Sequence, residues 1–136
     1  MKRIIFALLL SFSAVAGAQT IGLHTVSAHE HSGMNNTNPG LYVRFDNGLT
    51  AGFYRNSYRE QSAYLAWTVE SAQWHNLSAA ITAGGVSGYP SARVMALVVP
   101  SVAYHVGESA VRLGIVPRPP KTGAAAALHL MLERHF

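Results

Sequence analysis

Hydrophobic and polar residues alternate one by one along most of this chain, and this alternation limits its fold more than any other feature. Successive side chains of a β-strand point to opposite faces, so a period of two predicts strands. The stretch from Leu41 to Asp46 shows the pattern, and Asp46-Asn47-Gly48 is a tight-turn signal because Asn-Gly readily adopts positive φ. With residues 20–29 as the first, eight such segments follow one another. Residues 94–104 are more uniformly apolar, and Pro100 is expected to break that strand.

The composition excludes several classes of protein. Hydrophobic residues make up 49% of the 136 positions and charged residues only 12%, half of the roughly 25% usual for soluble domains. After residue 18 no run of 18 apolar residues occurs, which excludes a helical membrane span in the rest of the chain. Cysteine is absent, which excludes disulfides, a thiol nucleophile, Cys-ligated zinc and an acylated N-terminal cysteine.

The start of the chain has the marks of a secretory signal peptide. Two basic residues precede an apolar run from Ile4 to Leu10, and Ala16-Gly17-Ala18 offers small residues for cleavage before Gln19. An N-terminal anchor helix is the alternative, but this apolar run is too short to span a bilayer. We therefore expect a signal peptide at 1–18 and one domain at 19–136. Without the two basic residues the net charge of +4 is halved, so charge does not support a nucleic-acid partner and none is expected.

Two all-β architectures are compatible with the alternation. A soluble sandwich turns its apolar strand faces inward, whereas an outer-membrane barrel turns them toward lipid and keeps polar residues in its lumen. Three observations favour the barrel: the chain is predicted to be secreted, it ends on Phe136 after an alternating strand, and its inter-strand segments alternate in length. The longer segments, expected outside the cell, are 30–40, 56–61, 84–93 and 117–123; the shorter ones, expected in the periplasm, are 46–48, 70–76 and 105–109. The sequence thus predicts an eight-stranded antiparallel transmembrane β-barrel in the outer membrane of a Gram-negative cell.

Charged residues fall into two groups on this topology. Arg44 and Arg112 are expected to meet Glu70 and Glu133 inside the barrel in a buried ion-pair network, because unpaired charges would be costly there. The second group is basic and lies at the outer rim, where such side chains can bind the phosphates of a lipid headgroup. Ordinary rim charge is the alternative. The candidate substrate-binding residues of this group are Arg55, Arg59, Arg93, Arg118 and Lys121.

A series of short segments, in order over most of residues 20–136, carries a family resemblance. The segments are Gly40-Leu41-Tyr42, Phe53 to Tyr58, Glu70-Ser71, Ile81 to Val86, Val98 to Ala103, Ile115-Val116-Pro117 and the final strand to Phe136. Together they resemble the lipid A palmitoyltransferases (PagP-type) of Gram-negative outer membranes. The resemblance implies an eight-stranded barrel that moves a palmitoyl chain from a phospholipid to lipid A. It also implies a lumen that measures the acyl chain and a functional His, Asp and Ser on outer loops.

Carried over position by position, the His of the family matches His24, the Asp matches Asn56 and the Ser matches Ser57. Pro100 and Pro117 match prolines of later strands, Pro100 near a lateral opening through which acyl chains enter. The chain departs from the family in two respects: only five residues separate the expected cleavage point from His24, which leaves no room for an amphipathic N-terminal helix, and Asn56 cannot ionise.

Acyl transfer to a hydroxyl needs a base, a group that orients the base and donors for the oxyanion. His24 is the candidate base, and Ser57 is the candidate hydroxyl partner or nucleophile. Asn56 is a poor substitute for an orienting carboxylate; it could donate its amide to the oxyanion instead, or Glu30 or Glu60 could supply the acid. The structural alternatives are that His24 only fills the lumen and that Asn56-Ser57 only forms a turn.

Three functions remain open on the sequence alone: acyl transfer from phospholipid to lipid A, a catalytically silent barrel with a structural or surface-interaction role, and a lipid A deacylase. Asn56 favours the silent barrel, whereas His24, Ser57 and the rim cations favour the enzymes. His29-Glu30-His31 places two imidazoles close together, but a metal site needs a third ligand, so a solvated loop is the better interpretation. We expect no metal or other cofactor, and a monomer whose partners are phospholipid, lipid A and the outer membrane.

Overall fold

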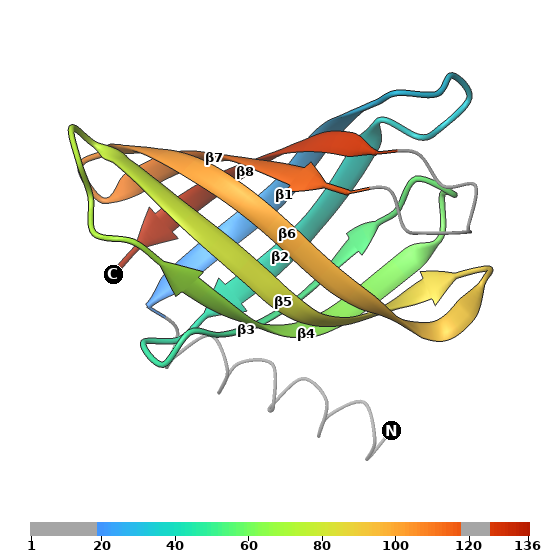
Figure 1. Cartoon of the computed structure of the whole chain (residues 1–136), viewed down its shortest axis with the longest axis horizontal. Helices are drawn as coiled ribbons and strands as arrows, with labels where there is room; N and C mark the ends of the chain where they lie inside the picture. Colours follow the sequence, from blue (N-terminus) through green and yellow to red (C-terminus); the bar gives the residue numbers. More distant parts are fainter. Residues whose placement is uncertain (1–18, 118–125) are drawn as a thin grey trace, which may run out of the picture.

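The protein is a closed barrel of eight antiparallel strands, as the alternation predicts (Figure 1). The computed structural model describes residues 19–117 and 126–136, so the expected signal peptide at 1–18 lies outside the described residues, as do Arg118 and Lys121. Each strand pairs with the next one in the chain, and β1 pairs with β8 to close the sheet. The strands are β1 (Thr20–His29), β2 (Thr37–Arg44), β3 (Leu49–Arg55), β4 (Gln61–Glu70), β5 (Leu77–Tyr89), β6 (Ala92–Val106), β7 (Ser109–Val116) and β8 (Ala127–His135).

The barrel turns its large apolar side chains outward and its polar side chains inward. In β4, Trp67 and Val69 are 54% and 75% exposed, whereas Ala66 and Thr68 between them are buried. In β8 the expected faces are confirmed, since His129 is buried and Leu128 is exposed. The sandwich is therefore the wrong fold: the sheet closes on itself, and its large apolar side chains lie outside. Within residues 19–117 and 126–136 no helix is long and apolar enough to cross a membrane.

The hairpin between β5 and β6 corrects one sequence prediction. The sequence predicts an inter-strand segment at 84–93, but β5 and β6 continue through it and only residues 90–91 separate them. Gly84 lies where β4 and β5 approach closely, since a Cβ at this position would lie 2.1 Å from the carbonyl oxygen of Leu65. The glycine thus permits close strand packing and does not mark a turn.

The predicted break of the strand at Pro100 is also wrong, because β6 continues through this residue. It pairs with Ile81 of β5 on one side, whereas the β6–β7 pairing starts one residue later, at Ser101 and Gly114. Pro100 thus lies at the start of a strand edge, where a missing N–H is tolerated. Among the described residues, no strand pairs with residues 92–100 on the β7 side.

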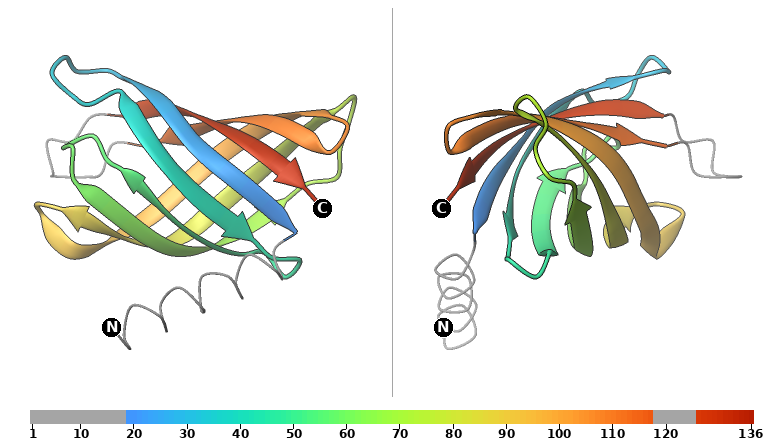
Figure 2. Two further views of the ribbon diagram at one scale, coloured as in Figure 1. Left: turned by 180° about the vertical axis from the view of Figure 1, so that it is seen from behind. Right: turned by 60° about the vertical axis from the view of Figure 1, so that its left-hand side comes forward.

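The predicted ion-pair network is present inside one end of the barrel. Arg112 donates to Glu133 at 2.8 Å and to Glu70 at 2.7 Å. Arg44 lies 3.1 Å from Glu70 and 3.5 Å from Glu133, and Tyr42 donates to Glu133 at 2.6 Å. The side chains of both arginines and of Glu133 are almost completely buried. The network closes the lumen at the end that carries the β2–β3 hairpin and the C-terminus (Figures 1 and 2).

Candidate functional site

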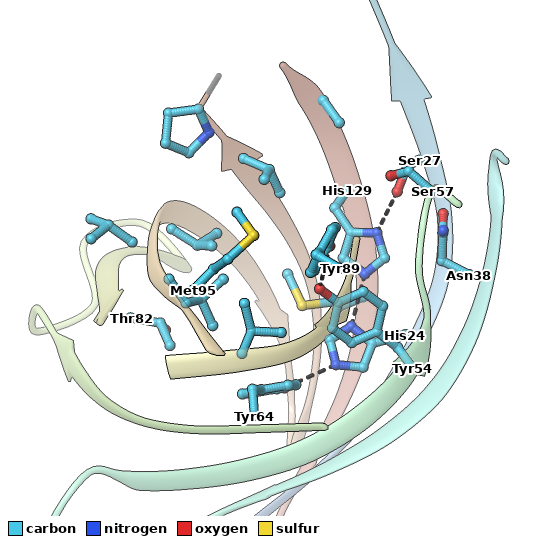
Figure 3. Close-up of a pocket in the computed structure, with 18 of the residues that line it drawn as sticks. His24, Ser27, Asn38, Tyr54, Ser57, Tyr64, Thr82, Tyr89, Met95 and His129 are labelled. Atoms are coloured by element: carbon cyan, nitrogen blue, oxygen red, sulfur yellow. Dashed lines mark hydrogen bonds between the residues drawn. The ribbon is translucent and has the colours of Figure 1, made fainter. Parts of the chain in front are cut away.

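A cavity of about 610 Å³ occupies the lumen. It reaches from Ser57 and His29, at the end that carries the β1–β2 and β3–β4 loops, down to Arg44 and Glu133 in the ion-pair network. Its two walls differ in polarity. The inward side chains of β6 form an apolar wall of Met95, Leu97 and Val99, while hydroxyl and imidazole groups of β1, β3, β4, β5 and β8 form a polar wall (Figure 3).

The cavity also reaches between two strands. Its lining includes Val98, whose side chain is 51% exposed on the outer face of β6, and Val116 and Pro117 at the end of β7. These residues flank the part of β6 that has no strand partner on the β7 side within the described ranges. Among the described residues, the cavity therefore extends to the unpaired edge of β6 beside the end of β7, in addition to its mouth at the loop end.

The hydroxyl of Ser57 is hydrogen-bonded to His29 at the mouth of the cavity. The Oγ of Ser57 lies 2.7 Å from Nε2 of His29, and Nδ1 of the same ring lies 2.7 Å from Oδ1 of Asn36. An amide oxygen only accepts hydrogen bonds, so Nδ1 of His29 carries the proton and Nε2 is free to accept the hydroxyl proton of Ser57. This is the order of groups in a nucleophile–base–orienter triad, with an amide as the orienting group, as in cysteine proteases of the papain type.

The backbone of the β1–β2 loop positions these three residues. The N–H of Ser27 donates to the carbonyl of Asn36 at 2.8 Å, and the N–H of Asn35 donates to the carbonyl of Ser57 at 2.9 Å. Gly33 has a φ of 86° in this loop, a conformation that side chains with a Cβ rarely adopt. The loop thus brings Asn36 to the ring of His29.

Asn56 holds the β3–β4 loop and does not take part in the triad. Its side chain is 0% exposed; Oδ1 accepts from the N–H groups of Tyr58 and Glu60, and Nδ2 donates to Ser62 Oγ and the carbonyl of Gly88. Two donors and two lone pairs are the whole capacity of an amide, so no bond remains for an imidazole. For Asn56 the structure therefore agrees with the alternative in which this side chain only stabilises a turn.

His24 lies deeper in the lumen and contacts neither Asn56 nor Ser57 through a hydrogen bond among the described residues. Its Nδ1 lies 2.8 Å from Nε2 of His129, and its Nε2 lies 2.9 Å from the hydroxyl of Tyr64. Nδ1 of His129 lies 2.7 Å from the hydroxyl of Ser27. A continuous chain of four side chains thus follows the polar wall: Ser27, His129, His24 and Tyr64 (Figure 3). We call it the histidine chain.

Three of the five cations expected at the outer rim are among the described residues, and all three lie at the loop end. Arg55, Arg59 and Arg93 are exposed. Nε of Arg55 donates to the carbonyl of Arg59 at 3.2 Å, and Arg59 has a φ of 65°. Within the described ranges, no group of three or more His, Cys, Asp or Glu side chains is placed to hold a metal ion.

Sequence reasoning did not place His29 and Asn36 in the site. The matching of motifs led to His24. Ser27 and His29 share the inward face of β1 with His24 only because a β-bulge between His24 and Val26 shifts the alternation by one residue. The position of His29 at the last residue of β1 was the available signal, because functional side chains gather where strands meet loops. No family model matches the chain, and no curated protein is similar to it.

Proposed function

We propose that this protein is an outer-membrane barrel that transfers an acyl chain, palmitoyl by the family resemblance, from a phospholipid to lipid A. The observation that carries the proposal is the pair of Ser57 and His29, 2.7 Å apart and oriented by Asn36, at the mouth of a cavity with one apolar wall. A nucleophile and a base within hydrogen-bonding distance, with a third group on the base, are what acyl transfer requires.

The chemistry follows from these atoms. Ser57 Oγ attacks the ester carbonyl of the phospholipid while its proton moves to Nε2 of His29, and an acyl-serine forms. The ester C–O bond breaks, and His29 returns the proton to the departing lysophospholipid oxygen. A hydroxyl of lipid A then gives its proton to His29, attacks the acyl-serine and releases Ser57, which recovers the proton. The acyl chain moves from one oxygen to another, and no oxidant or cofactor is consumed.

The shape of the cavity supports an acyl substrate. A hydrocarbon chain can lie against Met95, Leu97 and Val99, while the ester is held beside Ser57 at the mouth. A side entrance at the unpaired edge of β6, next to Val98, would let a chain enter from surrounding lipid and not only from water.

The outer surface of the barrel supports a membrane location. Large apolar side chains cover it, and exposed aromatic residues occur near both ends, with Trp74 and Phe136 at the end closed by the ion-pair network and Phe53 and Tyr58 toward the loop end. Aromatic girdles around an apolar band are typical of outer-membrane barrels. Arg55, Arg59 and Arg93 at the loop end would then face the phosphates of lipid A.

Mass spectrometry of lipid A from a Gram-negative host, with and without the protein, tests the proposal. We expect a gain of one acyl mass with the wild type, no gain with Ser57→Ala or His29→Ala, and the wild-type gain with Ser87→Ala. Ser87 is a matched serine that does not line the cavity, and its Oγ forms hydrogen bonds with the backbone N–H and carbonyl of Ala63. Loss of an acyl mass would identify a deacylase, and unchanged lipid A from a host with folded protein would identify a silent barrel.

A further inference from the structure

The histidine chain has one more proton than its hydrogen bonds use. Neutral His24 and His129 carry one N–H each, and the hydroxyls of Ser27 and Tyr64 carry one proton each, whereas only three bonds join the four groups. Each bond uses one proton. One O–H is therefore left at one end of the chain, on Ser27 or on Tyr64. Within residues 19–117 and 126–136, neither hydroxyl has another hydrogen-bond partner.

The chemistry of the two ends selects the direction of the chain. A phenol is a stronger donor and a weaker acceptor than an aliphatic hydroxyl, so Tyr64 donates to Nε2 of His24. Nδ1 of His24 then donates to Nε2 of His129, and Nδ1 of His129 donates to the Oγ of Ser27. Because Ser27 accepts this bond, its own proton is free to be donated to a group in the cavity that Ser27 lines.

The free hydroxyl of Ser27 lies in the same mouth as the triad. Ser27 and His29 are two residues apart on β1 and face the same side of the strand. The backbone N–H of Ser27 donates to Asn36, whose side chain contacts the ring of His29. Ser27 and Ser57 both line the cavity, and both appear at its upper end in Figure 3.

We propose that Ser27 is a catalytic residue that donates its hydroxyl proton to the oxyanion formed when Ser57 attacks the ester, and that His129, His24 and Tyr64 are positioning residues that aim this proton. The inference rests on the proposed acyl transfer, and it adds to the nucleophile and base a hydrogen-bond donor for the oxyanion. A donor fixed before the reaction stabilises developing charge without reorganisation, which is the largest single contribution in many enzymes. His24 and His129, which are buried in the lumen, would then position the hydroxyl of Ser27 and not act as the base.

Steady-state acyl transfer from phosphatidylethanolamine to lipid A in detergent micelles tests the inference. We expect Ser27→Ala to lower kcat about 10²- to 10³-fold, the usual cost of one lost oxyanion donor. KM for the phospholipid should stay unchanged, because the charge exists only in the transition state. Ser27→Thr, which keeps the hydroxyl, should restore most of kcat, and Ser87→Ala should behave as wild type.

A double-mutant cycle separates positioning from mere structural support. Tyr64→Phe should lower kcat less than Ser27→Ala does, and it should have no further effect when Ser27 is already alanine, because it acts only through that hydroxyl. Heat-modifiable mobility on gels checks that each variant is folded. Wild-type kcat in Ser27→Ala, or an equal loss from Tyr64→Phe in both backgrounds, would overturn the inference and leave the acyl transfer standing. A folded wild type that transfers no acyl chain would overturn the proposed function and the inference with it.

Discussion

Ser57 and His29 are 28 residues apart in the chain, yet the hydroxyl of one lies 2.7 Å from Nε2 of the other. The contact joins the end of β1 to the β3–β4 loop across β2. It depends on the β1–β2 loop, whose Asn35 donates its backbone N–H to the carbonyl of Ser57. The same loop places Asn36 on the far side of the imidazole, so one short segment positions both the nucleophile and the orienting group.

Asn36→Asp should raise acyl-transfer activity. A carboxylate accepts the proton of Nδ1 as the amide does and also stabilises the imidazolium that forms, and loss of such a carboxylate costs about 10⁴ in rate in the serine-protease template. The gain should be smaller than this, because Asn36 is exposed and water screens the charge. Measurement of kcat for the wild type, Asn36→Asp and Asn36→Ala checks this; Asn36→Ala at the wild-type rate would remove Asn36 from the site.

Asn56→Asp should destabilise the protein, even though it restores the acid of the family pattern. A carboxylate cannot donate to the carbonyl of Gly88, which therefore loses its partner at a cost of about 1–3 kcal/mol, whereas the hydroxyl of Ser62 can turn and donate to the carboxylate. Urea unfolding in detergent would measure this loss. Asn47→Asp is the matched control: its exposed side chain accepts from the N–H of Leu49, which a carboxylate also does, so stability should change by less than about 0.5 kcal/mol. A higher stability for Asn56→Asp would contradict the role of the amide in the loop.

The substitution Leu65→Arg tests whether the outer face of the barrel contacts lipid or water. Leu65 is 57% exposed on the outer face of β4. Arginine at such a position near the bilayer midplane costs about 2–4 kcal/mol, whereas on a surface in water the change would be close to neutral. Folding into phospholipid vesicles, followed by heat-modifiable mobility, should fall for Leu65→Arg and stay normal for Ser91→Arg in the exposed β5–β6 hairpin. Equal folding of both variants would contradict the membrane location.

Arg112→Ala should be far more damaging than Arg134→Ala. Arg112 is buried between Glu70 and Glu133, and its removal leaves carboxylates without their main partner, at a cost of about 3–5 kcal/mol. Arg134 pairs with Glu108 on the surface at 2.6 Å, and such pairs contribute about 0–1 kcal/mol. Unfolding free energies in urea give the comparison. Similar losses for both variants would show that the network is not the main support of this end of the lumen.

The fold could be predicted closely because a strand face is a local property. Alternation alone assigns Trp67 and Val69 to one face and Thr68 to the other, and eight such segments with an apolar outer face close into a barrel. The errors occurred where local signals have two meanings. The sequence predicts an inter-strand segment at 84–93, but β5 runs to Tyr89, and at Gly84 the close approach of β4 requires a residue without a side chain.

The ion-pair network of Arg44, Arg112, Glu70 and Glu133 was also determined by the sequence, because four charges on the inner faces of a narrow lumen must meet one another. The partner of Ser57 was decided only by the tertiary structure. His24 and His29 lie on the same strand, and the stagger between β1 and the β3–β4 loop determines which of them reaches the mouth of the cavity. That stagger depends on the pairing of every strand around the closed sheet and on the path of one loop. Both are global properties, which no short segment of the sequence contains.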